Sequence, residues 1–245
     1  MHISLAQRLI RDVALPSLAR DLLRAQWGAF LLGSIAPDAR VSSGIERSNT
    51  HFFEYGPQID PPPDKAMLNR FPELARQAIE DDTRAVFIAG YAAHLAMDEI
   101  WCTDILFPMF VNGGDWGTRE TKFLVLHLLL ADLDRRDRSL IPPEDYDALA
   151  AAIPKGWLPF MTDEGLVAWR NIIAEQLAPG GKNRTTEILG NRVGLAPEML
   201  DATIDDPQKM QELTWNHVPP PRVAAAEEAM YVRSRDAVIT YLSGT

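Results

Sequence analysis

Residues 90–101, GYAAHLAMDEIW, decide how this sequence is interpreted, because they place a histidine and an aspartate inside an otherwise apolar helical segment. His94 and Asp98 are four residues apart, so they project from one face of a helix, one turn from each other. Two side chains at this spacing can chelate a metal ion, although hydrogen-bonded core pairs and exposed ion pairs use it too. Gly90, one turn before His94, removes bulk and lets another backbone or an ion approach. Since an unpaired carboxylate among apolar neighbours costs free energy, the stretch predicts a partner for Asp98.

Helical periodicity dominates the rest of the chain, and strand alternation is hard to find. We therefore expect an all-α fold, a single multi-helical domain over residues 1–245 with at least eight helices. Asp81 or Asp82 is the expected N-cap of the central helix, and Pro108 its expected end. Residues 40–64 are expected to form a loop. The expected helices are 3–14, 17–34, 65–79, 82–107, 118–137, 144–152, 163–177, 182–192, 196–203, 206–214 and a last one from the triple proline at 219–221 to about 242.

Composition and charge limit the classes of function. Hydrophobic residues make up 47% of the chain and charged residues 24%, which is ordinary for a globular protein. A net charge of -10 argues against a wide surface for nucleic acid, so no nucleic-acid partner is expected. A small phosphate site made electropositive by bound metal remains compatible with it. The N-terminus lacks the apolar run of a signal peptide, and no stretch reaches the roughly 18 apolar residues of a membrane span. We therefore expect a cytoplasmic protein without stable membrane insertion.

Three further residues are candidate metal ligands. Asp38 follows Pro37, where the apolar segment FLLGSIA must end, and His51 opens HFFEY after the polar SNT. Taken alone, Asp38 is typical of a turn aspartate and His51 of a partly buried loop histidine. His2 stands at the very start of the chain, where a side chain is normally frayed.

The order of three segments resembles the zinc-dependent phospholipase C family, which belongs to an all-helical superfamily that also contains fungal zinc nucleases. The segments are GSIAPDARV (33–41), THFFEYG (50–56) and FIAGYAAHLAMDEIW (87–101), and the similarity covers roughly residues 2–110. The resemblance implies a metal site built from this N-terminal half. It implies that Asp38, His51, His94 and Asp98 are ligands in one site, with Asp98 able to bridge to a second ion near His2. This mixture of imidazole nitrogen and carboxylate oxygen suits zinc, but also manganese, iron or nickel.

The sequence departs from the family at a further metal site, which the family builds from histidines and a glutamate in an H-x3-E helix. The only candidate here is His127, and Ala131 stands four residues after it. Asp132 is five residues away, about 140° around the helix, so it cannot chelate from the same face. We therefore expect His127 to be a core histidine, His217 a cap or loop residue, and the site to hold one or two ions.

These expectations favour a metal-dependent phosphoester hydrolase acting on a phospholipid or a small phosphodiester, with the small phosphoester ranked first. Asp38 is the expected catalytic residue, in a mixed role of ligand and general base. Glu99 is a weaker candidate because it points about 100° away from the His94 face. The alternative is a non-catalytic, metal-stabilised helical protein or interaction module, and a nuclease is disfavoured by the net charge. A site open to water would favour catalysis, and a closed, fully protein-ligated ion would favour structure. The sequence leaves the oligomeric state open.

Overall fold

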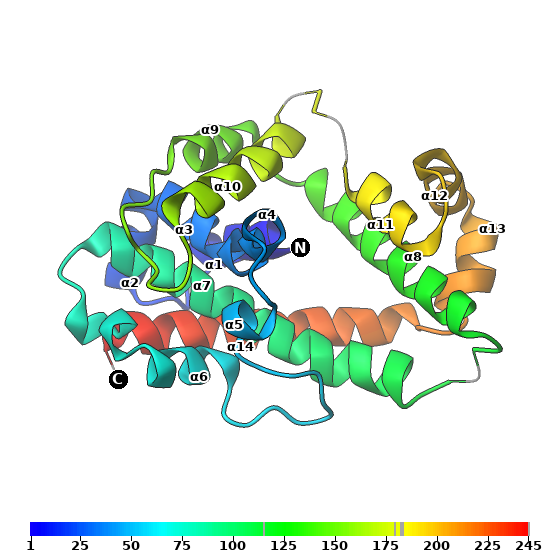
Figure 1. The fold of residues 1–245 in the computed structure, drawn as a ribbon, viewed down its shortest axis with the longest axis horizontal. Coiled ribbons are helices and arrows are strands. Elements are labelled where there is room, and N and C mark those ends of the chain that lie inside the picture. The colour runs from blue at the N-terminus through cyan, green and yellow to red at the C-terminus, as the bar shows by residue number, and fades with distance from the viewer. Residues whose placement is uncertain (115, 179, 182–183, 245) are drawn as a thin grey trace.

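The computed structural model describes residues 1–114, 116–178, 180–181 and 184–244. Within these ranges every regular element is helical and no strand occurs, which confirms the all-α prediction (Figure 1). The α-helices are α1 (His2–Arg11), α2 (Ser17–Ala25), α3 (Trp27–Ile35), α4 (Arg40–Ser43), α5 (Ser48–His51), α6 (Pro63–Arg70), α7 (Asp82–Ile100), α8 (Arg119–Arg138), α9 (Pro143–Ala151), α10 (Asp163–Leu177), α11 (Thr185–Val193), α12 (Pro197–Ile204), α13 (Pro207–Met210) and α14 (Pro220–Ser243). The 3-10 helices are η1 (Ala36–Ala39), η2 (Pro72–Leu74) and η3 (Arg76–Ala78), and the π-helical segments are η4 (Trp101–Val111) and η5 (Gln211–Trp215).

Helix α7 is the central element, packed against both α3 and α14. Asp81 is its N-cap, and the side chain accepts a hydrogen bond from the backbone N–H of Thr83 at 2.9 Å. The contact with α3 brings the two backbones together at paired glycines. A Cβ atom on Gly33 would lie 2.0 Å from the carbonyl oxygen of Phe87, and one on Gly90 would lie 2.4 Å from that of Phe30. Gly90 thus serves the approach of another backbone.

Several expected helix limits were wrong. The segment 17–34 is interrupted at Gln26, whose backbone angles (φ -121°, ψ 34°) leave the helical region between α2 and α3. The Nε1–H of Trp27 donates to Asp145 of α9 at 2.7 Å, a long-range contact at the start of α3. The chain also continues past Pro108 as η4, because proline can widen or kink a helix without ending it.

The expected loop over residues 40–64 contains two short helices, α4 and α5, and α6 begins at its end. The expected helix 65–79 ends at Arg70 and is followed by η2 and η3. The predicted segment 163–177 coincides with α10. Residues 182–183 of another expected helix lie outside the described residues, and α11 is described from Thr185.

The apolar core is divided among clusters on either side of a cleft. The largest cluster joins α1, α2, α3, α7, α9 and α10. Two smaller ones join α8 to η4 and α14, and α8 to α11 and α12. In Figure 1 the helices α11, α12 and α13 lie to the right, apart from α9 and α10. Among the described helices, none is both long and apolar enough to cross a bilayer.

Candidate metal centre

Five side chains from four helical segments converge beside the middle of α7. They are His2 of α1, Asp38 of η1, His51 of α5, and His94 and Asp98 of α7. Their ligand atoms form two groups, each with all its atoms within 4.8 Å of one another: His2, Asp38 and His94 in one, and His51, His94 and Asp98 in the other. All the ligand candidates from the sequence are thus brought together. The grouping differs in one respect from the site expected from the sequence. Asp38 is grouped with His2 and His94, and not with His51 and Asp98.

His94 has one ring nitrogen free for a ligand bond. Its Nδ1 lies 2.8 Å from the carbonyl oxygen of Ser34, and only a protonated Nδ1 can donate to that acceptor. The deprotonated Nε2 is buried and has no hydrogen-bond partner among the described residues. A buried polar atom without a partner costs free energy, which an ion bound there would offset. The contact between α3 and α7 therefore also fixes the tautomer of His94.

His51 is oriented in the same way by its neighbour. Its Nδ1 lies 2.9 Å from Oγ1 of Thr50, and that hydroxyl donates its own proton to the carbonyl oxygen of Arg47 at 3.2 Å. The hydroxyl oxygen then accepts from Nδ1–H of His51, which leaves Nε2 as the nitrogen available to a ligand. This Nε2 lies 3.4 Å from Oδ2 of Asp98 and 3.6 Å from Oδ1 of Asp38. His51 therefore directs Nε2 toward both carboxylates.

Asp98 extends across both groups. Its Oδ1 lies 3.8 Å from Nε2 of His2, and its Oδ2 lies 3.4 Å and 3.9 Å from Nε2 of His51 and His94. Because His94 offers a single nitrogen, it can serve only one ion at a time. A carboxylate has two oxygens, so Asp98 is the side chain suited to bridge a pair of ions. In the structure Nη2 of Arg47 donates a hydrogen bond to Oδ2 of Asp98 at 3.0 Å. Arg47 is therefore the partner that the sequence predicts for this carboxylate.

His2 is held in place despite its position at the start of the chain. Its ring stacks on that of His94, with centroids 3.7 Å apart and planes 7° from parallel. Ile3 and Leu9 are buried on the same helix, so α1 is docked on the core. Burial, together with the neighbouring His94, lowers the pKa of His2, and burial also lowers the pKa of His94. Both imidazoles are therefore neutral near pH 7 and keep a lone pair for a metal.

Asp38 is the most exposed member of the centre, with 39% of its side chain accessible. Burial around the carboxyl group acts to raise its pKa. Hydrogen bonding to His51 and the neighbouring imidazoles act in the opposite direction and hold the pKa below its usual range. The carboxylate is therefore ionised at neutral pH and accessible to solvent.

Comparison with known proteins agrees with this geometry. Residues 1–101 match the model of the family described as zinc dependent phospholipase C. This N-terminal part of the chain is therefore similar to the zinc-dependent phospholipase C family. Comparison with curated proteins gave no match, nor did comparison with solved structures. The matched range contains the five candidate ligands and ends at Trp101, the first residue of η4, before α8 and α11.

The donor set fits the zinc that the family implies. Three imidazoles and two carboxylates supply the nitrogen and oxygen ligands that zinc prefers. Two of the imidazole nitrogens, Nε2 of His94 and Nδ1 of His2, are buried without a hydrogen-bond partner among the described residues. Such orphaned nitrogens are expected where a metal ion belongs.

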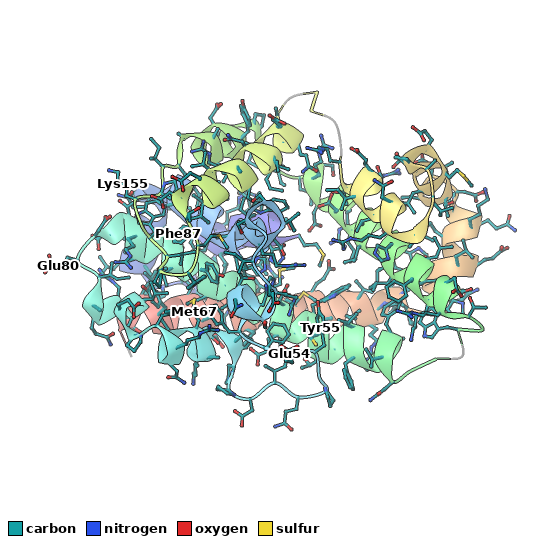
Figure 2. The ribbon with its side chains drawn as sticks, in the orientation of Figure 1. Glu54, Tyr55, Met67, Glu80, Phe87 and Lys155 are labelled. Atoms are coloured by element: carbon teal, nitrogen blue, oxygen red, sulfur yellow. The ribbon has the colours of Figure 1, made fainter. Side chains whose placement is uncertain are left out.

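The centre opens into a cleft of about 960 Å³, lined by residues of the matched range 1–101 and by residues of helices beyond it. Asp38, His51 and Asp98 line the cleft on one side, and α8 and α11 contribute to the other. Tyr55, labelled in Figure 2, also lines the cleft. The guanidinium Cζ of Arg47 lies 4.4 Å from the centroid of its ring. The candidate ligands are therefore open to a molecule larger than water.

The sequence interpretation missed the basic residues of this cleft, which are Arg40, Arg47, Arg119, Lys122 and Arg192. They come from distant parts of the chain and follow no recognised motif. The spacing of Arg119 and Lys122, three residues apart at the start of α8, was the only local signal that they share a face.

The two remaining candidate histidines lie outside both ligand groups. His127 is buried, 4% exposed, and its Nδ1 lies 2.6 Å from the carbonyl oxygen of Phe123. It lines the cleft, so it is a core histidine at the cleft wall. His217 lies in the turn between η5 and α14, where its ring stacks on Trp116 with centroids 4.8 Å apart. Within the described residues, neither belongs to a group of three metal-ligating side chains.

Proposed function

We propose that this protein is a metal-dependent, most simply zinc-dependent, phosphoester hydrolase that acts on a phospholipid or a small phosphodiester. The observation that carries the proposal is the position of the centre. The candidate ligands Asp38 and Asp98 lie at the wall of a large cleft, and the other charged side chains that line it in the described part of the chain are all basic. A phosphodiester carries the negative charge that such a cleft attracts. The family match supports the same class of reaction.

Separate residues would bind the metal and transfer the proton. His2, Asp38, His51, His94 and Asp98 would hold one or two ions, with Asp98 as the bridge. Bound zinc would supply a water of lowered pKa and neutralise charge on the phosphoryl oxygens. Asp38, ionised and accessible, accepts the proton of the attacking water as its oxygen bonds to phosphorus. The bond from phosphorus to the departing oxygen breaks, and that oxygen takes up a proton from solvent.

Arg47 is the residue placed to bind the substrate next to the ions. Its guanidinium contacts Asp98 and lies against the rings of Phe53 and Tyr55, with Cζ 4.5 Å and 4.4 Å from their centroids. These aromatic faces restrict the guanidinium plane, which favours two parallel hydrogen bonds to phosphate oxygens. Arg47 would thus neutralise one phosphoryl charge and orient the phosphorus toward Asp38.

The alternative of a metal-stabilised protein without activity is less consistent with this arrangement. A structural zinc is usually closed off by four protein ligands. Here Asp38 is 39% exposed and lines two cavities, the cleft and a second one of about 290 Å³ that also contains His2. This access from solvent favours a centre that exchanges ligands.

The test begins with elemental analysis of protein purified without added metal. Hydrolysis of bis(4-nitrophenyl) phosphate and of a dihexanoyl phospholipid is then measured with and without a chelator. Asp38→Asn is expected to lower kcat by about 10²–10⁴-fold, since it removes the general base. The matched control is Asp21→Asn, because Asp21 is an exposed carboxylate on α2 that pairs with Arg24 at 3.7 Å and lies outside both ligand groups. Activity that survives chelation or Asp38→Asn would refute the proposal, and a metal-loaded protein without activity would support the non-catalytic alternative.

A further inference from the structure

The charge of the cleft is opposite to that of the whole protein. The chain carries a net charge of -10, yet five of the charged side chains at the cleft wall are basic. Among the described residues, the only acidic ones at this wall are Asp38 and Asp98, both candidate metal ligands. Like charges gathered in one cavity repel one another, so the arrangement destabilises the protein unless an anion binds there.

Four of these cations have no counter-charge among the residues that the structure describes. Among the described residues, no carboxylate lies within 4.0 Å of a side-chain nitrogen of Arg40, Arg119, Lys122 or Arg192, and the Nε of Arg40 is buried without a hydrogen-bond partner. Other arginines are paired, as Arg233 is with Asp64 and with Glu99 at 2.9 Å. Arg119 also begins α8, where the helix dipole disfavours a positive charge. Structural pairing therefore does not account for the cations of the cleft.

Apolar side chains make up much of the remaining cleft wall. Val111 and Phe123 are 52% and 41% exposed, and the side chains of Leu106, Phe110 and Leu126 line the same space. Exposed apolar surface beside a row of cations is suited to a molecule with both a hydrocarbon part and anionic groups.

We propose that the cleft selects an amphiphilic phosphodiester whose headgroup carries a second anionic group, a carboxylate or a phosphate, bound by Arg119, Lys122 and Arg192. This inference rests on the proposed function in one respect, since it assumes that the phosphodiester itself binds at the metal centre beside Arg47. The hydrocarbon part contacts the apolar wall of η4 and α8. A headgroup that is neutral beyond its phosphodiester leaves the three cations without a partner.

The direct test compares two short-chain lipids that differ by one carboxylate. Dihexanoyl phosphatidylserine and dihexanoyl phosphatidylethanolamine are titrated, below their micelle concentrations, into zinc-loaded Asp38→Asn protein by isothermal calorimetry, so that hydrolysis during the titration is suppressed. The serine lipid is expected to bind about tenfold more tightly, because charge-assisted hydrogen bonds to the extra carboxylate are made only there. The preference is expected to shrink as salt rises. Equal affinity for the two lipids would overturn the proposal.

A pair of triple variants locates the selectivity. Arg119→Gln, Lys122→Gln and Arg192→Gln together are expected to remove the preference for the serine lipid. The matched control neutralises three exposed cations outside the cleft, by Arg11→Gln, Lys65→Gln and Lys155→Gln, and is expected to keep it. Lys155 lies in the loop at the upper left of Figure 2. Loss of the preference in both variants would mean that net charge, and not the cleft, selects the ligand, and would overturn the proposal.

Two further measurements separate the parts of the inference. Glycerophosphoserine lacks the acyl chains and is expected to bind about tenfold more weakly than the serine lipid, because it buries less apolar surface. Equal binding would overturn the amphiphilic part. Hydrolysis of both lipids is followed separately. Selective binding without hydrolysis would support the cleft assignment and refute the proposed function, whereas hydrolysis without selectivity would do the reverse.

Discussion

At the scale of single residues, the hydrogen bonds to the non-ligating nitrogens of the histidines hold the centre in order. Thr50 accepts from Nδ1–H of His51 while its own proton is donated to Arg47. Thr50→Val keeps the shape and removes the acceptor, so the tautomer and ring orientation of His51 are no longer fixed. Zinc affinity is expected to fall about 10–100-fold. Competition with a chromophoric chelator measures the zinc affinity. The control is Thr83→Val, which removes another partly buried hydroxyl at the start of α7 and should leave the zinc affinity unchanged.

The number of ions is a second question at this scale. His2→Ala is expected to lower the metal content by about one ion per chain while the fold is kept. His2 belongs only to the ligand group that it forms with Asp38 and His94. His94→Ala is expected to remove the primary ion as well, because His94 belongs to both groups. Elemental analysis of both variants under the same dialysis decides this. Unchanged metal content and unchanged phosphodiesterase activity in His2→Ala would contradict the two-ion arrangement in favour of one ion.

The sequence carries information on the ligands but not on their supports. Asp38, His51, His94 and Asp98 could be predicted because the family places these residue types in a recognisable order. The carbonyl of Ser34 and the guanidinium of Arg47 could not, since their contacts depend on how α3 and α5 approach α7. A backbone carbonyl has no sequence signature at all.

At the scale of elements, the contact between α3 and α7 positions the centre. Gly90→Ala would place a Cβ atom 2.4 Å from the carbonyl oxygen of Phe30, so the helices must separate. The expected cost is about 1–3 kcal/mol of unfolding free energy, and separation also weakens the hydrogen bond from His94 to Ser34. Urea unfolding and zinc affinity are measured together. The control is Ala89→Ser, which buries a hydroxyl at the neighbouring position. If the zinc affinity falls as far in Ala89→Ser as in Gly90→Ala, the helix-separation argument is contradicted.

The same elements mark the limits of prediction from periodicity. The apolar pattern predicts α10 and the body of α7 well, because each helix has a clear start signal and an uninterrupted pattern. It fails at Gln26, where no proline or glycine announces the break between α2 and α3. It fails again at Pro108, where a proline suggests an end and η4 continues. In both places tertiary packing overrides the local signal.

At the scale of the whole molecule, the cleft is the feature that no local pattern predicts. Its basic side chains come from α4, α8 and α11 and from the segment before α5, and only the assembled fold brings them together. The net charge of -10, averaged over the chain, argued against a wide nucleic-acid surface and gave no sign of a local basic cleft. Its distribution changes that conclusion, because a ligand responds to the local potential and not to the sum.

The pH dependence of stability follows from the buried histidines. Burial lowers the pKa values of His2, His94 and His127, so the metal-free native protein keeps these rings neutral at a pH where the unfolded chain protonates them. Unfolded histidines titrate near pH 6.5, and below that pH the unfolded state binds more protons than the native state, so stability falls as pH falls. Each ring can lower the free energy of unfolding by up to about 2 kcal/mol between pH 6.5 and pH 5. The lowered pKa of Asp38 acts in a more acidic range, since carboxylates lose their contribution as pH falls toward their native pKa.

Urea unfolding of chelator-treated protein at pH 7.5, 6.5, 5.5 and 5.0 measures this decline. His127→Gln is the diagnostic variant, because His127 lies outside both ligand groups and an amide can replace the hydrogen bond to Phe123. Its unfolding free energy should fall less steeply below pH 6.5 than that of the unaltered protein. With saturating zinc the protein should be more stable at pH 7.5 and lose stability more steeply on acidification, since protonated imidazoles release the metal. An unfolding free energy that is the same at pH 7.5 and pH 5 in the metal-free protein would show that these histidines are protonated in the native state, contrary to the neutral ligand set on which the metal centre depends.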